Sequence, residues 1–212
     1  MSIYLIFILS ALETHKNDLE KITNKVDIIS EEKNAGKTIL LSEHDIEENY
    51  HLMLSQRIRE KAELALQSNM PYDWIKQEIL VDEMKRYYIS SFKAVESDGY
   101  SKISPAARLI KTDRSNFKRD IKYYGFNLED LMIEAEELES IEIPIAILEK
   151  GISYYKKELL IRKIDFAIND MILELNDGII SQAARQINVD RNNYKRKLKE
   201  LGIDPNKYRT RY

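Results

Sequence analysis

Apolar residues after Ser42 recur at the three- and four-residue spacing that places them on one face of a helix. The positions are Ile46, Tyr50, Met53, Leu54, Ile58, Ala62, Ala65 and Leu66. This period predicts an amphipathic helix whose apolar face is buried. Ser42 is expected to cap this helix, with Asp45 three residues later at the spacing of a capping box.

A second helix is predicted from Pro71, because proline is favourable at the first helical position. Its buried face is expected to run toward Val95, and Asp98 with Gly99 is expected to end it. The apolar positions are Trp74, Ile75, Ile79, Leu80, Met84, Tyr88 and Phe92.

Later segments predict an acidic helix over about residues 128–138, an interruption at Pro144, and a long helix over about residues 152–175. The chain has 212 residues with only 6 glycines and 4 prolines. The expected fold class is therefore all-α.

The chain carries one segment twice. Residues 104–125 match residues 181–202 at a constant offset of 77 positions, sharing Ser, Ala-Ala-Arg, Ile, Asp-Arg, Asn, Lys-Arg, Lys and Gly. In each copy a short helix with small residues precedes a basic helix, and a long apolar-striped helix comes before both. This order, present twice, predicts two helix-turn-helix units that read DNA.

Local signals in the second copy define its expected helices. Ser181 is expected to cap the short helix over residues 182–187, and Asp190 is expected to cap the basic helix. Ala183 and Ala184 are small, as a close helix crossing requires. The turn at Asn188 is expected to be left-handed, a conformation that asparagine tolerates.

The basic helix has an inward side and an open side. Tyr194, Leu198 and Leu201 are spaced to face inward, and Gly202 is expected to stop the helix. Phe117 and Ile121 correspond to Tyr194 and Leu198. The open side of the second helix then carries Arg191, Asn192, Asn193, Lys195, Arg196 and Lys199, and that of the first carries Arg114, Ser115, Asn116, Lys118, Arg119 and Lys122.

Positive charge is concentrated in the two copies, although the whole chain has a net charge of −3. Residues 86–127 hold 9 basic and 4 acidic residues, and residues 162–212 hold 11 and 7. The other segments are acidic: residues 1–85 hold 10 basic and 16 acidic residues, and residues 128–161 hold 3 and 9. Such local basic blocks are typical of phosphate contact.

The open side chains suit double-stranded DNA. Arginine can bond guanine bidentately and asparagine can bond adenine bidentately in the major groove. Lysines and arginines farther along the helix reach phosphates, which position the protein without specifying sequence. Lysine at position 111 is less favourable in a left-handed turn than asparagine at position 188. Asp120 stands where the second copy has Lys197. The first unit is therefore expected to bind DNA more weakly.

Residues 178–203 closely resemble the helix-turn-helix of the Fis family, the DNA-binding module of the Fis nucleoid protein and of many bacterial enhancer-binding activators. The resemblance covers roughly 50 residues of each copy and implies contacts to bases and phosphates. By position these fall on Arg191, Asn193, Lys195 and Arg196, and on Arg114, Asn116, Lys118 and Arg119. The family serine before Ala-Ala reaches phosphate, which implicates Ser181 and Ser104.

The chain departs from the Fis pattern in three respects. Asn188 or Lys111 stands at the usual turn glycine, and Tyr194 or Phe117 stands at the usual leucine. The ATPase module of an enhancer-binding activator is also lacking. The family works as dimers, so a homodimer is one expectation. Alternatively, residues 71–97 and 152–175 pair within one chain and hold two reading helices about 34 Å apart, one DNA turn.

Four regions are predicted. Residues 1–70 form a mostly helical N-terminal region of unassigned role, residues 71–127 the first Fis-like unit, residues 128–151 an acidic linker, and residues 152–212 the second Fis-like unit. The tyrosine pairs along the chain (Tyr87 and Tyr88, Tyr123 and Tyr124, Tyr154 and Tyr155) are expected to pack between helices rather than stack on bases.

Several classes of site are not expected. Without cysteine, disulfides and cysteine-ligated zinc are excluded. His15, His44 and His51 have no metal-site spacing, and no catalytic constellation is present, so neither a metal, a cofactor nor an enzyme is predicted. Gly36-Lys37-Thr38 resembles the end of a phosphate-binding loop, but Glu31 occupies the position of its required glycine.

The apolar start, residues 1–10, is shorter than the roughly 20 residues of a membrane span. It also has no preceding basic residue to mark a signal peptide. We therefore expect a cytoplasmic, nucleoid-associated protein, bacterial or phage-borne, without a membrane partner. The expected function is sequence-specific transcriptional regulation. The alternatives are an architectural or recombination-assisting DNA-bending protein and a helical protein-interaction adaptor.

Overall fold

The computed structural model describes residues 42–68, 70–96 and 99–209. The chain divides into two units, Met1–Ser42 and Glu43–Tyr212. The described helices belong to the second unit. The expectations for the apolar start, His15, the loop around Gly36 and Asp98 lie outside the described residues.

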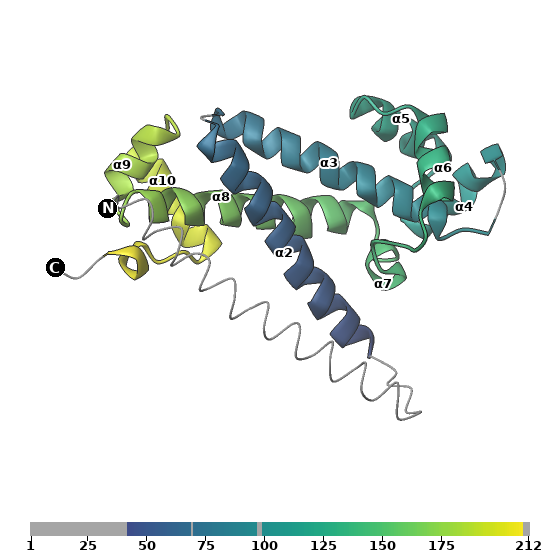
Figure 1. Ribbon diagram of the computed structural model, residues 1–212, viewed down its shortest axis with the longest axis horizontal. Coiled ribbons are helices and arrows are strands. Elements are labelled where there is room, and N and C mark those ends of the chain that lie inside the picture. The colour runs from purple at the N-terminus through teal and green to yellow at the C-terminus, as the bar shows by residue number, and fades with distance from the viewer. Residues whose placement is uncertain (1–41, 69, 97–98, 210–212) are drawn as a thin grey trace. The chain divides into compact units, whose positions relative to one another are not determined.

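The second unit is helical, and none of its described residues lies in a strand, which confirms the all-α fold class. Figure 1 shows how the helices are arranged. Their bounds are α2 Glu43–Gln67, α3 Tyr72–Lys93, α4 Ile103–Leu109, α5 Arg114–Tyr123, α6 Leu128–Glu137, α7 Ile145–Leu148, α8 Ile161–Leu175, α9 Ile180–Gln186 and α10 Arg191–Leu201.

The two long helices α3 and α8 pack against each other in antiparallel directions. At the start of α3, the Tyr72 hydroxyl accepts a hydrogen bond from Asn169 in the second half of α8, at 3.3 Å. Toward the end of α3, Tyr87 stacks on Tyr155, which lies in the π-helical stretch Tyr154–Leu160 leading into α8, with ring centroids 4.2 Å apart. This pairing is the one expected for residues 71–97 and 152–175.

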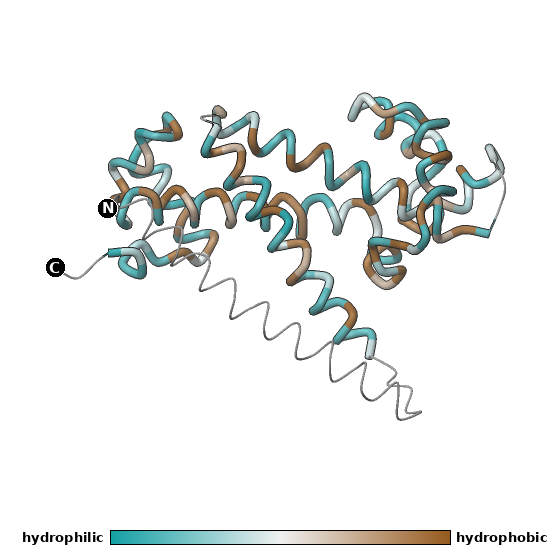
Figure 2. Tube along the Cα trace, viewed as in Figure 1, coloured by the Kyte–Doolittle hydropathy of each residue, from teal (hydrophilic) through white to brown (hydrophobic). Residues whose placement is uncertain are grey.

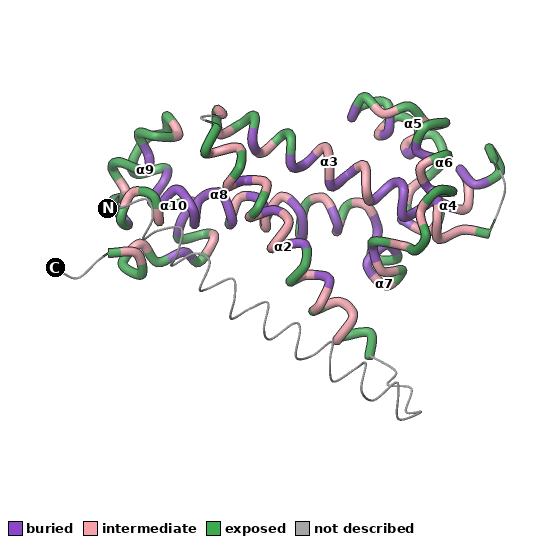
Figure 3. Tube along the Cα trace, viewed as in Figure 1, coloured by how far each residue is buried: buried purple, intermediate pink, exposed green. Residues whose placement is uncertain are grey.

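Helix α2 crosses both members of this pair and closes the core. Its buried residues, Tyr50, Leu54, Ile58 and Ala62, are spaced four apart. The resulting alternation of hydrophobic and hydrophilic stretches is visible along α2 and α3 in Figure 2, and Figure 3 shows the buried positions gathered along α3 and α8. Helix α2, which the sequence analysis assigned to the N-terminal region 1–70, thus packs against α3 and α8.

Tyrosines form the polar part of this core. The hydroxyls of Tyr50 and Tyr155 lie 2.9 Å apart, and the Tyr87 hydroxyl donates to the carbonyl of Leu148 at 3.3 Å. All three rings are buried. Tyr87 and Tyr155 thus pack between helices as predicted, whereas Tyr123 is 74% exposed.

A buried ion pair joins α2 to α3. Glu83 is fully buried, and its carboxylate accepts from Arg57 Nη2 at 2.9 Å and from Arg57 Nε at 3.3 Å. Lone buried carboxylates are costly, and two hydrogen bonds from one guanidinium offset that cost.

Three sequence expectations are wrong in detail. Met53 is 56% exposed and Trp74 is 69% exposed, because Leu54 and Ile75 beside them occupy the buried face. Helix α3 ends at Lys93, before the predicted stop at Gly99. The errors at Met53 and Trp74 share one cause: apolar spacing alone does not show which of two adjacent residues meets a neighbouring helix.

The predicted acidic linker is part of the packed unit. Helix α6 buries Leu131, Met132 and Ala135 and packs against α3. Glu136 and Glu137 are exposed on its other side, and Glu134 at the edge of the contact pairs with Lys85 of α3 at 2.7 Å. The acidic segment is amphipathic, and its apolar face holds it in place.

Candidate nucleic-acid interface

The two sequence copies fold into the same helix-turn-helix geometry, α4 with α5 and α9 with α10. The turn residues Lys111 and Asn188 have φ values of 54° and 53°, the left-handed conformation expected for this turn. The amide of Thr112 donates to the carbonyl of Ala107 at 2.9 Å, and the amide of Val189 donates to that of Ala184 at 2.9 Å. The turn is thus the same in both units.

Aspartates cap both basic helices, as predicted for Asp190. The Asp190 carboxylate accepts from the amides of Asn192 and Asn193 at 2.9 and 3.1 Å. Asp113 accepts from the equivalent amides of α5, both at 2.8 Å. The bond from the amide of Asn116 is the main cause of the lowered pKa of Asp113. Each cap satisfies two amides that the first helical turn leaves free.

The predicted cap at Ser181 is wrong. Helix α9 begins at Ile180, and Ile179 occupies the cap position without a side-chain hydrogen bond to the helix. Ser181 is the second residue of α9 and is exposed, and Ser104 is the second residue of α4 and is half-buried. Helix α9 begins two residues earlier than predicted, at Ile180 rather than at residue 182, and α4 likewise begins with an isoleucine, Ile103.

Each basic helix is anchored on the long helix that precedes its unit. The Phe117 ring meets Phe92 edge-on, with centroids 5.3 Å apart. The Tyr194 hydroxyl donates to the carbonyl of Asn169 at 3.4 Å. Both rings are buried, so their predicted role in packing holds. The alanine pairs are buried at the helix crossings, at Ala106, Ala107, Ala183 and Ala184.

The predicted DNA-contacting side chains lie on the outer sides of these units. Half-buried positions are Ser104 and Asn116. The others are exposed, namely Arg114, Lys118, Arg119, Lys122, Ser181, Arg191, Asn192, Asn193, Lys195, Arg196 and Lys199. One set thus lies on α4 and α5, and an equivalent set lies on α9 and α10.

A hydrogen bond within each basic helix links an asparagine to an arginine three residues later. Arg119 Nη2 donates to Asn116 Oδ1 at 2.6 Å, and Arg196 Nη2 donates to Asn193 Oδ1 at 3.3 Å. Sequence reasoning did not include this link, although the spacing of three is typical of side-chain pairs on one helix face. The link holds each arginine over the first turn of its helix.

Two further exposed arginines were left out of the predicted set. Arg108 and Arg185 occupy matching positions in the last turns of α4 and α9 and are exposed. Their identity in both copies was the available signal. They extend the cationic surface from the basic helices to the turns.

Lys197 has a different role from the one its charge suggested. It is half-buried, donates to the Tyr72 hydroxyl at 2.9 Å and lies 3.4 Å from Asp165. Burial lowers its pKa, but the bond to Tyr72 and the charge of Asp165 outweigh burial and leave the pKa raised. Lys197 therefore joins α10 to the start of α3 and is not an open cation.

A reciprocal contact joins the first unit to the start of the second long helix. The amide of Ile152 donates to the carbonyl of Ile110 at 2.9 Å, and the Lys156 ammonium lies 5.0 Å from the centre of the Tyr124 ring. Each helix-turn-helix unit is thus held by its own long helix and by the start of the other one. Both units are therefore packed against the α3–α8 pair.

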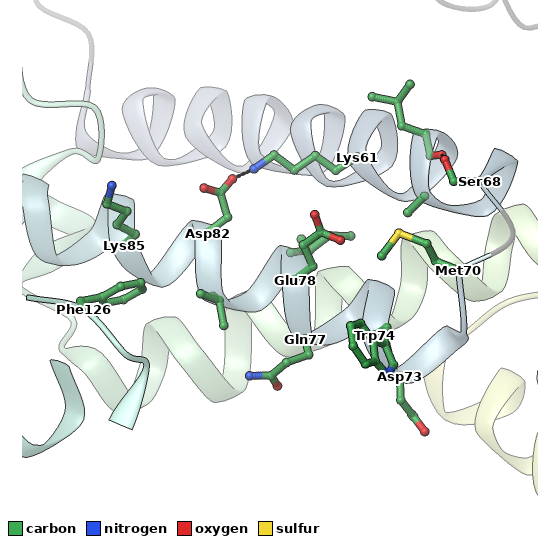
Figure 4. Close-up of a pocket in the computed structure, with 14 residues that line it drawn as sticks. Lys61, Ser68, Met70, Asp73, Trp74, Gln77, Glu78, Asp82, Lys85 and Phe126 are labelled. Carbon is green, nitrogen blue, oxygen red and sulfur yellow. Dashed lines mark hydrogen bonds and ion pairs between the residues drawn. The ribbon is translucent and has the colours of Figure 1, made fainter. Parts of the chain in front are cut away.

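A groove of about 1160 Å³ lies between α2 and α3, away from these outer surfaces. Trp74, Met70 and Phe126 line it (Figure 4), and the ion pair between Lys61 and Asp82 crosses it. Among the described residues, none of the predicted DNA contacts lines this groove. It is therefore separate from the candidate interface.

At the start of α2, ligand atoms of His44, Asp45 and Glu48 approach within 4.8 Å of one another. The sequence expectation considered histidine spacing alone and did not foresee this grouping. His44 and Glu48 are exposed and Asp45 is partly exposed, as is common for acidic groups at a helix start. Within the described ranges, no helix has the length and apolar content needed to cross a membrane.

The chain was compared with protein-family models, with curated proteins and with solved structures, and no significant match was found in any of the three comparisons.

Proposed function

We propose that this protein is a transcriptional regulator that binds double-stranded DNA through α5 and α10. The supporting observation is the repetition of one exposed cationic surface on two units with the same capped, left-handed turn geometry. In a protein-interaction adaptor, the fold of the two copies would require equivalent buried residues to be alike, but equivalent exposed residues could differ. Here Arg114 and Arg191, Lys118 and Lys195, and Arg119 and Arg196 are identical and outward.

The antiparallel α3–α8 pair supports a single binding surface built from both units. Antiparallel helices are related by a two-fold rotation about an axis perpendicular to the plane that contains them. Such a rotation leaves height along the axis unchanged, so it would place α5 and α10 at the same level along that axis. We infer an intramolecular pseudo-dimer in which one chain reads two half-sites about one DNA turn, roughly 34 Å, apart. The half-sites are inverted, although the sequence repeat is direct.

The chemistry of the interface divides between bases and phosphates. Arg114 and Arg191 open their helices, where side chains reach base edges in the major groove. Lys118, Lys122, Lys195 and Lys199 lie farther along and contact phosphates. We propose that Arg119 and Arg196 also contact phosphate, because their links to Asn116 and Asn193 orient them.

Binding of fluorescent duplexes selected from a random pool tests this function. We expect affinity to fall steeply with salt concentration, because each phosphate contact releases counterions. Arg191→Ala should reduce discrimination between sequences by about 1–3 kcal/mol, and Lys195→Ala should weaken all duplexes alike. Arg162→Ala, which removes an exposed charge from α8, is the matched control and should change little.

Two outcomes decide against the proposal. Absence of salt-dependent binding by the full chain would favour the adaptor. Equal affinity for selected and random duplexes would favour an architectural DNA-bending protein, because sequence-specific regulators bind their sites at least about 1000-fold more tightly than random DNA.

A further inference from the structure

Apart from the buried aromatic residue of each reading helix, residues 114–119 and 191–196 are identical except at one position. Position 115 of the first helix is serine, and the equivalent position 192 of the second helix is asparagine. The identical pairs are Arg114 and Arg191, Asn116 and Asn193, Lys118 and Lys195, and Arg119 and Arg196. Any difference in how these six positions read bases therefore depends on Ser115 and Asn192.

These two residues are held in the same place. Each is the second residue of its helix. The Ser115 amide donates to Asp113 at 2.8 Å, and the Asn192 amide donates to Asp190 at 2.9 Å. Both side chains are exposed. The two positions thus present different chemistry from equivalent backbone geometry.

Asn192 has the group suited to adenine. A carboxamide donates and accepts at once and can bond the N6 and N7 of adenine bidentately, whereas a serine hydroxyl contacts bases with less discrimination. The neighbouring Asn193 already accepts from Arg196 through its carboxamide oxygen. The Asn192 side chain makes no hydrogen bond to another residue in the described part of the chain, so its whole carboxamide is open.

We propose that Asn192 determines specificity, requiring adenine at one position of the half-site read by α10. The equivalent position of the half-site read by α5, opposite Ser115, accepts more than one base. The preferred DNA is then an imperfect inverted repeat with one base more strictly specified in one half. This inference rests on the proposed function and adds the base that separates the two half-sites.

Selection from a random duplex pool by the full chain, compared with Asn192→Ser and Ser115→Asn, tests the inference. The unmodified chain should enrich sites with one half more strictly defined. Asn192→Ser should lose the adenine preference at that position and bind the original site about tenfold more weakly. Ser115→Asn should gain the preference in the other half, so that the enriched sites become more symmetric. Asn192→Gln serves as a control with the same amide on a longer side chain.

Three results would overturn the inference. The first is an unchanged enriched site for Asn192→Ser. The second is no gain of adenine for Ser115→Asn while both variants still bind DNA. The third is the absence of any enriched site for the unmodified chain. That result would mean that the proposed function itself fails, and not only the role of Asn192. Far-UV circular dichroism on each variant checks that these exposed substitutions leave the fold intact.

Discussion

Lys111 and Asn188 lie 77 residues apart in the chain and share one backbone conformation, with φ values of 54° and 53°. A left-handed conformation disfavours side chains with a Cβ by roughly 1–2 kcal/mol. Lys111 adopts this conformation in the first copy, at the position where the second copy has the better suited Asn188. The turn is therefore a property of the repeated unit rather than of the residue that occupies it.

Replacing Lys111 by glycine should stabilise the protein by about 0.5–1 kcal/mol, because glycine adopts the left-handed conformation without strain. Lys118→Gly in the right-handed middle of α5 is the control and should destabilise it by about 1 kcal/mol. Urea unfolding measures both changes. A loss of stability in both variants would contradict the assigned turn geometry.

Removing the buried carboxylate of Glu83 should lower the free energy of unfolding by about 3–5 kcal/mol, because the Arg57 guanidinium loses its partner beneath α2. The paired variant Arg57→Met with Glu83→Leu should recover most of this loss, since Lys61 and Arg86, which lie 3.8 and 3.9 Å from Glu83, keep Asp82 and Glu142 as partners. Thermal unfolding compares the two. Equal losses in both variants would show that packing, and not the unpaired charge, dominates.

Gly178→Ala should be more damaging than Gly125→Ala. Both glycines have positive φ, at 71° and 77°, so both substitutions introduce backbone strain. A Cβ at Gly178 would lie 2.2 Å from the carbonyl oxygen of Pro205, whereas one at Gly125 meets nothing within 4 Å. We expect a difference of at least about 1 kcal/mol in urea unfolding. No difference would mean that the segment around Pro205 moves aside freely.

The tyrosine cluster should make the fold sensitive to alkali. Burial raises the pKa of Tyr50 to about 12 from 10.0, and burial raises the pKa of Tyr155 well above its ordinary value. The folded state therefore holds these protons more tightly than the unfolded state. The stability that these two buried hydroxyls contribute is fully present below pH 10 and is lost as the pH rises toward 12.

Circular dichroism and tyrosinate absorbance over this pH range test the expectation. Tyr155→Phe removes one buried ionising group and keeps its ring against Tyr87, so unfolding should begin at higher pH. The same variant should cost about 1 kcal/mol at neutral pH, where the hydroxyl pair is lost. Tyr123→Phe, at an exposed position, is the control. An identical alkaline profile for the Tyr155 variant and the unmodified chain would count against the cluster.

Much of the local structure could be predicted from the sequence, because its causes are local. The Asp190 cap and the left-handed Asn188 depend on residues within a few positions of each other. The inward side of α10 follows from the spacing of Tyr194 and Leu198 alone. The same local signals occur in both copies, so each copy supports the prediction made from the other.

What the sequence could not show depends on contacts between distant helices. Trp74 has the spacing of a core residue, but the groove between α2 and α3 leaves it exposed. Lys197 counts only as positive charge of the second copy in the sequence, whereas in the structure it donates a hydrogen bond to Tyr72, 125 residues away. The docking of α6 on α3 likewise requires a partner surface that periodicity does not identify.

Hydroxyl-radical footprinting of the selected duplex, at one chain per duplex, tests the two-headed binding surface most directly. The account predicts two protected half-sites about one DNA turn apart, with Arg114→Ala removing protection from one half and Arg191→Ala removing it from the other. Protection of a single half-site by one chain, or loss of the same half in both variants, would contradict it.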